Sequence, residues 1–308
     1  MTDMIQRLSK KSLVNYTKYK GVSLSAAGRD SALKTSNLLL MNLLIKLLLF
    51  FLVTTSFGAY AQDAKKNAVA NSPLITDRPD ATESPQTVPA GFLQYEGGFM
   101  YSNDKAGSNG SEKLVYNTGL FRLGLLDNLE LRLGYNVLNE KREILKGVFS
   151  PREFSGIDPM LLGFKVAIRQ GEEGKANLGV LGHVYLPFTA SKDFRPDTTA
   201  ADFRFLVSHS LSEKSSLSYN LGAQWGADSS EIAYIYTLAY GFALSSKWSY
   251  YAEVYGDFPE KSKANHSWDT GLTYLLSNAV QLDVTIGSGI NTNQTILLAA
   301  GLSVRFPR

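Results

Sequence analysis

The chain contains no cysteine among its 308 residues. This absence excludes disulfides, cysteine-ligated zinc, iron–sulfur clusters, a cysteine nucleophile and a lipid-modified N-terminal cysteine. Histidine is scarce as well, with three residues, and none of them shows a metal-ligand spacing such as H-x-x-x-H. We therefore expect neither a metal site nor another cofactor.

One apolar run stands out, in the segment MNLLIKLLLFFLVTTSFGAYAQ that starts at Met41. Lys46 supplies a positive charge, Leu47–Phe57 form an apolar core, and Ala59-Tyr60-Ala61 gives an A-x-A cleavage site, an order typical of a secretory signal. The alternative is a membrane anchor, but the clean apolar run is shorter than the ~20 residues that a spanning helix needs. We predict that residues 1–61 are a mis-assigned N-terminal extension plus a signal peptide, cleaved after Ala61.

Excess basic charge is confined to this precursor segment. Residues 1–61 hold eight of the 31 Lys and Arg residues but two of the 28 Asp and Glu residues. The formal net charge of +3 for the whole chain therefore becomes −3 for the remainder. That balance lacks the basic footprint of a nucleic-acid-binding protein, so we expect no nucleic-acid partner.

A helical period is missing between Phe92 and Phe306. Every second residue is apolar over successive stretches that end in turns, which is the pattern of β-strands. The predicted strands, about twelve in number, are Phe92–Tyr101, Leu114–Leu123, Asn128–Leu138, Ile157–Arg169, Asn177–Phe188, Asp202–Leu211, Leu217–Gly226, Ile232–Leu244, Trp248–Asp257, His266–Leu276, Val280–Gly289 and Thr295–Phe306.

The two faces of these strands differ in chemistry. In the stretch from Val280, valine, leucine and isoleucine alternate with Gln281, Asp283 and Thr285. A soluble β-sandwich would also alternate. However, the strands approach the roughly 9–11 residues of a tilted membrane strand, and aromatic residues such as Trp248 gather near strand ends, as in membrane girdles.

The connections support a membrane barrel with its N-terminus in the periplasm. Long polar connections at 102–113, 139–156 and 189–201 alternate with short ones, as outside loops and periplasmic turns do. We predict an all-β protein, an antiparallel transmembrane outer-membrane β-barrel over residues 91–308. Residues 62–90 form a polar periplasmic leader before it.

The last strand carries a further pattern. Ala300, Leu302, Val304 and Phe306 alternate toward a near-terminal aromatic residue. This resembles the C-terminal strand signal that the barrel-assembly machinery recognises. We therefore expect that machinery and membrane lipids as partners.

Four segments together point to a known family: TDRPDATESPQTVPAGFLQYEGGF from Thr76, LFRLGLLDNLELRLGYN from Leu120, GIDPMLLGFKVAI from Gly156 and LTYLLSNAVQLDVTIGSGIN from Leu272. They resemble the outer-membrane transporter family named "MetA-pathway of phenol degradation". The resemblance implies a barrel that takes up or exports small compounds, with aromatic compounds as one candidate class.

Many ionisable side chains fall on the inward face of the predicted strands. The candidate pore-lining residues are Glu96, Arg122, Glu130, Arg132, Lys165, Asp202, Arg204, Glu253, Asp269, Asp283 and Arg305. One interpretation is structural, since buried charges must be paired and a network of salt bridges would brace or plug the lumen. The other is a polar permeation path whose charges select solutes. The sequence leaves both open.

The leader LITDRPDATESPQTVPAGF, which starts at Leu74, is too rich in Asp, Arg, Thr and Pro for a plain linker. We predict an ordered extended segment that enters the periplasmic mouth or the lumen and meets Arg132 or Arg305. Its candidate plug residues are Asp77, Arg78, Asp80 and Glu83.

For function, we expect passage of a small solute across the outer membrane. The alternative is a closed, plugged barrel with a structural or binding role. An enzyme is disfavoured, because the chain has no G-x-S-x-G elbow and no evident serine partner for its histidines.

Overall fold

Strands make up nearly all of the regular structure in the computed structural model, which describes residues 72–107, 109–143, 150–171, 174–229 and 231–307. The predicted signal peptide and its cleavage site lie outside these residues. The described elements are β1 (Phe92–Ala106), β2 (Asn109–Leu126), β3 (Leu129–Glu143), β4 (Arg152–Ile157), β5 (Met160–Arg169), β6 (Asn177–Leu186), η1 (Pro187–Thr189), η2 (Lys192–Phe194), β7 (Ala200–Ser210), β8 (Ser215–Trp225), β9 (Ile232–Ala243), β10 (Trp248–Pro259), β11 (Asn265–Ser277), β12 (Val280–Gly289) and β13 (Gln294–Pro307). Among the residues described, no helix is long and apolar enough to cross a membrane.

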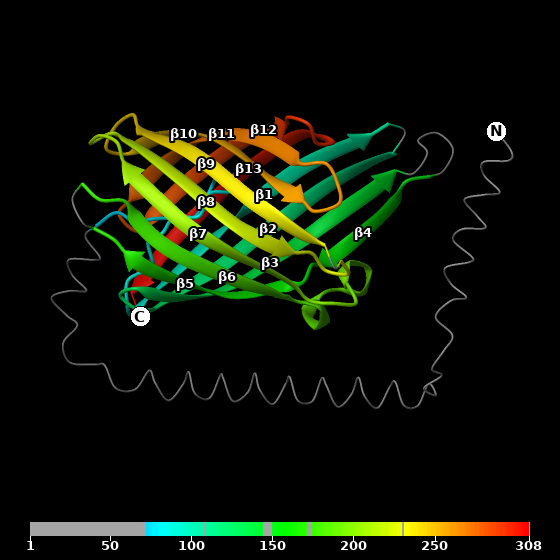
Figure 1. The fold of residues 1–308 in the computed structure, drawn as a ribbon, viewed down its shortest axis with the longest axis horizontal. Helices are drawn as coiled ribbons and strands as arrows, with labels where there is room; N and C mark the ends of the chain where they lie inside the picture. Colours follow the sequence, from blue (N-terminus) through cyan, green and yellow to red (C-terminus); the bar gives the residue numbers. More distant parts are fainter. Residues whose placement is uncertain (1–71, 108, 144–149, 172–173, 230, 308) are drawn as a thin grey trace, which may run out of the picture. The chain divides into compact units, whose positions relative to one another are not determined.

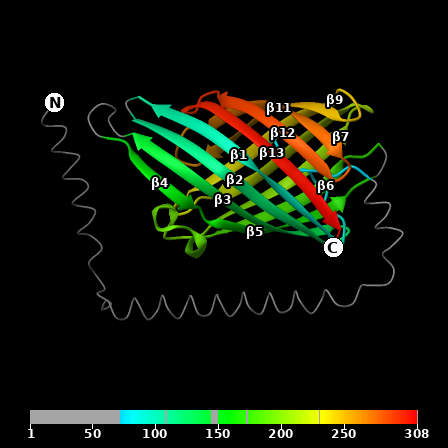
Figure 2. The same ribbon diagram turned by 180° about the vertical axis from the view of Figure 1, so that it is seen from behind.

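The strands form one closed antiparallel barrel. Each strand pairs with its neighbours in chain order, and β1 pairs with β13 from Phe92↔Pro307 onward to close the ring. Figures 1 and 2 show the tilted strands, with β13 beside β1 in the second view. Because β4 and β5 both pair with β3, they share one strand position. The predicted barrel of about twelve strands is thus confirmed.

The fourth predicted strand, Ile157–Arg169, is wrong as a continuous element. It breaks at Asp158-Pro159 into β4 and β5. Proline has no backbone N–H to donate and is poorly placed inside a sheet. Beside the break, the connection after η1 replaces the ladder: Ser191 N–H donates to the Ile157 carbonyl at 2.8 Å, and Ile157 N–H donates to Ser191 Oγ at 3.0 Å.

Two of the long connections predicted as loops are largely strand. In 102–113, β1 and β2 continue as a hairpin down to the pair Ala106↔Asn109. In 139–156, β3 and β4 pair from Asn139↔Ser155 to Arg142↔Arg152. These hairpin ends are polar on both faces, because a ribbon that extends into water needs no apolar face. The alternation that identifies a strand therefore disappears although the backbone pairing continues.

Burial in this barrel is the reverse of that in a soluble protein. On β12, Val284 is 50% exposed while its neighbours Asp283 and Thr285 are 4% and 6% exposed. Large apolar side chains point outward around the barrel, for example Phe99, Phe205, Tyr234, Leu272 and Leu298. Such an outer face is stable in lipid, so the chain is an outer-membrane barrel with charge inside and apolar residues outside.

We predict that Val284→Arg lowers the free energy of unfolding in lipid vesicles by about 2–4 kcal/mol, the cost of a charge at mid-bilayer. Ile290→Arg, beyond the end of β12, is the matched control and should cost roughly 0–1 kcal/mol. Urea unfolding followed by fluorescence measures both. Equal losses in the two variants would contradict the assignment of the outer face.

Candidate functional site

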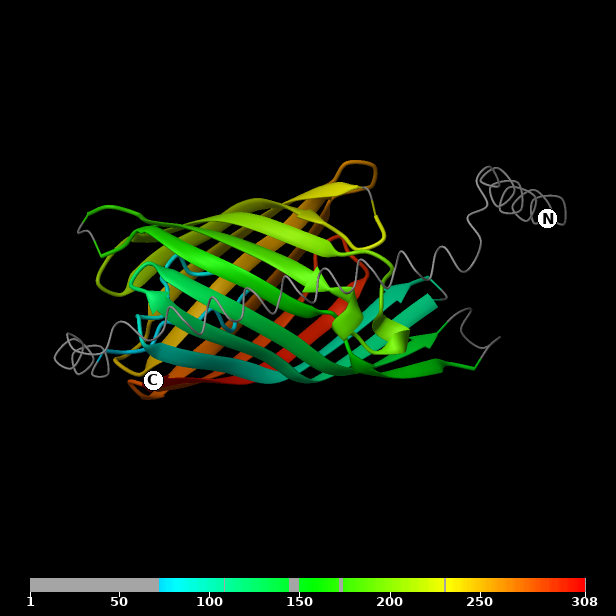
Figure 3. The same cartoon turned by 90° about the horizontal axis from the view of Figure 1, so that it is seen from below.

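The described part of the leader, residues 72–90, is attached to one rim of the barrel at both of its ends. At its start, Leu74 N–H donates to the Asn278 carbonyl at 2.8 Å, and Arg305 Nη2 donates to the Ser72 carbonyl at 2.6 Å. Just after it, Gly91 N–H donates to the Gly124 carbonyl at 3.1 Å. Between these points the leader runs inside the barrel, where Figure 3 shows it in cyan.

Asp77 is the centre of the leader's charged contacts. Its carboxylate accepts hydrogen bonds from Arg132 Nη1 at 2.6 Å and from Lys165 Nζ at 2.7 Å, and it lies 3.1 Å from Arg122 Nη1. Burial alone would raise the pKa of Asp77, but Arg122, Lys165 and Arg132 together hold that pKa well below its usual range. Asp77 is therefore ionised and bound by three cations from β2, β3 and β5.

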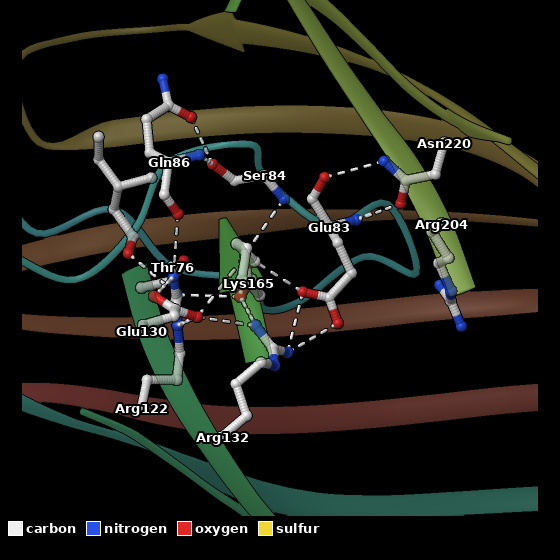
Figure 4. A network of polar contacts seen from close by, with 12 residues as sticks. Thr76, Glu83, Ser84, Gln86, Arg122, Glu130, Arg132, Lys165, Arg204 and Asn220 are labelled. Atoms are coloured by element: carbon white, nitrogen blue, oxygen red, sulfur yellow. Dashed lines mark hydrogen bonds and ion pairs between the residues drawn. The ribbon is translucent and has the colours of Figure 1, made fainter. Parts of the chain in front are cut away.

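Three further carboxylates complete this network, part of which appears in Figure 4. Glu130 forms a bidentate pair with Arg122, with both N···O distances 2.9 Å. Glu96 accepts from Arg122 Nη1 at 2.7 Å, and Glu83 of the leader accepts from Arg132 Nη2 at 2.9 Å. Three cations thus face four carboxylates in a buried cluster. Such pairing offsets the several kcal/mol that each buried ion loses by desolvation.

The opposite wall holds the leader mainly through its backbone. Ala81 N–H donates to Glu253 at 2.7 Å, and Glu83 N–H donates to Asn220 Oδ1 at 2.7 Å. Thr82 Oγ1 donates to Thr237 Oγ1 at 2.7 Å and also contacts Glu253. The leader therefore spans the lumen, from the cationic wall of β2, β3 and β5 to the wall of β8, β9 and β10.

Asp80 has a different environment from Asp77. Burial, followed by the charges of Glu253 and Asp269, raises the pKa of Asp80 well above its usual range. On the barrel wall, Asp269 is paired in register with Glu253, and its Oδ1 has no hydrogen-bond partner within the described residues. This side of the leader is acidic, whereas the wall beside Asp77 carries Arg122, Arg132 and Lys165.

Arg78 crosses to a third part of the wall. Its Nη2 and Nε lie 2.9 Å and 3.3 Å from the two oxygens of Asp283, and its Nη1 donates to Thr118 Oγ1 at 2.9 Å. Gln281, also on β12, donates to Thr76 Oγ1 at 2.9 Å. The leader is thus bonded to strands around most of the barrel.

Two cavities flank the leader. The larger, about 580 Å³, lies on the side away from the rim that holds Arg305 and is lined by residues that include Tyr135, Tyr185, Asp202 and Arg204. The smaller, about 360 Å³, opens near that rim and is lined by residues that include Ser216, Tyr251 and Gln281. Much of the lining of both cavities is polar.

The candidate residues from the sequence fall into five groups in space. Arg122, Glu130, Arg132, Lys165, Glu96, Asp77 and Glu83 form the central network. Asp202 and Arg204 lie on the wall of the larger cavity, where Asp202 also binds His183 Nδ1 at 3.2 Å and the Tyr185 hydroxyl at 3.0 Å. Glu253, Asp269 and Asp80 form the acidic side, Asp283 binds Arg78, and Arg305 lies at the rim.

Sequence reasoning missed the neutral residues that hold the leader. Asn220 and Thr237 bond to its backbone or hydroxyls and are 1% and 6% exposed, yet neither is ionisable. Their inward position could have been predicted from strand parity, because Asn220 alternates with outward Tyr219 and Leu221. What parity cannot supply is their partner, since the leader has no periodic pattern.

These features define an outer-membrane β-barrel. The fold is similar to that of an outer membrane channel from Pseudomonas putida F1, with a TM-score of 0.59 at 13% identity over 74% of this chain and all of that one. The CymD monoaromatic hydrocarbon channel gives a TM-score of 0.42 at 10% identity over 72% of this chain and 90% of that one. The KdgM porin gives 0.45 at 8% identity over 70% and 99%. At 13% identity, the similarity to the Pseudomonas putida channel concerns the fold.

The family is shown by the sequence itself. The chain belongs to the family described as "Putative MetA-pathway of phenol degradation", which matches residues 76–306. A comparison with curated protein sequences gave no match. The match begins within the leader, so the family pattern includes the segment that lies in the lumen.

We predict that Asp77→Asn releases the leader, because three buried cations would lose their shared carboxylate. Breaking one side of a buried ion pair costs about 3–5 kcal/mol. A broad-specificity protease added to the folded barrel should cut residues 74–90 much faster in this variant than in the parent.

The control is Asp193→Asn, a substitution of the same chemistry on the exposed residue of η2. It should leave the cleavage rate unchanged. Rapid cleavage of the parent protein itself would show that the leader is a linker.

Proposed function

We propose that this barrel carries a small solute across the outer membrane by passive or facilitated passage. The supporting observation is the pair of cavities, about 580 Å³ and 360 Å³, that lie on either side of the leader. Volumes of this order suit small organic molecules. The family description and the channel with a similar fold agree with this function, and aromatic compounds are a candidate solute class.

The charged residues of the cavity walls would choose among solutes. In the larger cavity, Arg132 and Arg204 face Asp158 and Asp202, so both signs of charge line the route. Rings of charged side chains are a common basis of selectivity in pores. The aromatic ring of Tyr185, whose hydroxyl donates to Asp202, borders the same cavity and offers apolar contact. A small molecule with a ring and a polar group matches this lining.

A second candidate function rests on the central network. Asp77 and the three cations around it are buried, and a plug held by this many charged contacts favours a closed barrel. Such a protein would bind or brace in the outer membrane rather than conduct. Conductance of the mature protein in planar bilayers separates the two functions, because a closed barrel shows none.

We predict that Arg204→Ala shifts ion selectivity toward cations, because the guanidinium lines the larger cavity beside Asp202 and is 20% exposed. The matched control is Arg142→Ala, on the hairpin of β3 and β4, where the side chain is 48% exposed. Reversal potentials in a salt gradient measure the shift. A channel whose selectivity is unchanged by Arg204→Ala would not use this wall.

We also propose an orientation with both termini in the periplasm and the β1–β2 hairpin outside. Epitope tags inserted beside Asn109 or Phe194 should then be labelled on intact cells. A tag beside Ser212, in the short turn between β7 and β8, should be labelled after the outer membrane is made permeable. Labelling of Ser212 on intact cells would contradict the proposed orientation.

In the proposed orientation the outward Leu302 and Phe306 of β13 are available to the barrel-assembly machinery.

A further inference from the structure

Arg78 occupies the junction between the two cavities. Among the residues that the structure describes, it is the one that borders both of them. We propose that Arg78 is a binding residue for small carboxylates at this junction, and that it makes the passage selective for them. The inference rests on the proposed channel function and names its solute class.

The guanidinium has donors to spare. An arginine carries five N–H groups, and the contacts of Arg78 with Asp283 and Thr118 use Nε, one N–H of Nη2 and one N–H of Nη1. One N–H on each terminal nitrogen therefore remains. N–H groups of a guanidinium are charge-assisted donors to carboxylate oxygens.

Arg78 is also more accessible than the three cations of the central network. Its side chain is 16% exposed, whereas those of Arg122 and Arg132 are 1% exposed and that of Lys165 is fully buried. The three buried cations are already bound to Asp77 and Glu130. A solute that enters either cavity therefore meets the guanidinium of Arg78 before theirs.

The wall of the barrel is shaped to receive this guanidinium. Gly98 of β1 and Gly301 of β13 are paired across the sheet. A Cβ atom built on Gly301 would overlap the Arg78 guanidinium, and one on Gly98 would lie 2.7 Å from Nη2. The two glycines form a notch that only a wall without side chains can provide, so the position of Arg78 is a feature of the barrel and not of the leader alone.

The leader is held to the barrel wall on both sides of Arg78. Asp77, the residue before Arg78, is bound to Arg132 on one wall. Thr82 is hydrogen-bonded to Thr237 on the opposite wall. A carboxylate can bind the remaining N–H groups of the guanidinium while Asp283 stays bound. An uncharged amide can accept from the guanidinium with its single carbonyl oxygen, but it lacks the negative charge and the second acceptor oxygen of a carboxylate. Carboxylates should therefore bind and pass in preference to their amides.

The test compares benzoate with benzamide, two molecules of nearly the same size that differ in charge. Uptake into proteoliposomes should be several-fold faster for benzoate with the parent protein. Arg78→Ala should abolish or reverse this preference, because Asp283 then stands unpaired at the junction. Gly301→Ala, which changes no charge but fills the notch, should also weaken it. Arg142→Ala is the matched control and should keep the preference.

Binding is measured separately from passage, by saturation-transfer NMR of benzoate on the protein in detergent. Loss of the benzoate signal in Arg78→Ala, with a folded barrel by heat-shifted gel mobility, supports the site even if no solute crosses in any variant. That last result would remove the channel function alone. Equal uptake and equal binding of benzoate and benzamide by the parent, or a benzoate preference unchanged in Arg78→Ala, would overturn the inference. Arg78→Lys, which keeps the charge but lacks the guanidinium, should show an intermediate preference.

A disulfide between the leader and the barrel wall tests whether the leader must leave the lumen for a solute to pass. Because the chain has no cysteine, Thr82→Cys with Thr237→Cys introduces a single pair at positions whose hydroxyls are 2.7 Å apart. The oxidised variant should keep benzoate-selective uptake. Loss of uptake on oxidation, restored by a reductant, would show that the leader must leave and would overturn a selectivity step at Arg78 with the leader in place.

Discussion

The carboxylate of Asp77 neutralises charge that the barrel wall leaves in excess. Arg122, Arg132 and Lys165 project inward from neighbouring strands, while the same wall supplies Glu96 and Glu130. Without Asp77 and Glu83 the wall would hold one cation too many in a confined space, at a cost of several kcal/mol. The leader is therefore not a tail that happens to enter the lumen. Its carboxylates, Asp77 and Glu83, pair with the cations of the wall.

The rest of the interior follows from that docking. With Asp77 held on one wall, the next residues must cross the lumen, and they reach Glu253, Thr237 and Asn220 on the other wall. The crossing divides the interior into two cavities and places Arg78 between them. If the barrel conducts as we propose, the segment that fills part of the lumen also supplies a residue, Arg78, that contacts the passing solute. In this proposal the network around Asp77 braces the lumen and Arg78 selects solutes. The two roles therefore belong to different inward charges.

Several elements of the barrel could be predicted because they obey a local rule. The alternation of Val284 with Asp283 and Thr285 indicates a strand with one apolar and one polar face, whatever its neighbours are. That rule failed where its physical basis ends. The hairpin ends near Ala106 and Arg142 lie beyond the apolar band and have polar residues on both faces. The break at Pro159 was readable in principle, since proline cannot donate to a ladder, but its neighbours keep the strand pattern on both sides.

The sequence by itself determined the architecture: a period of two residues, strands of membrane length and inward charges of both signs, read one strand at a time. It also determined that the leader is too charged and too rich in proline to be a plain linker. Only the tertiary structure decided which charges meet. Asp77 and Lys165 are 88 residues apart, and Arg78 and Asp283 are 205 apart. Barrel closure sets those distances in space, because the stagger and tilt of all the strands together choose which inward residues share a level.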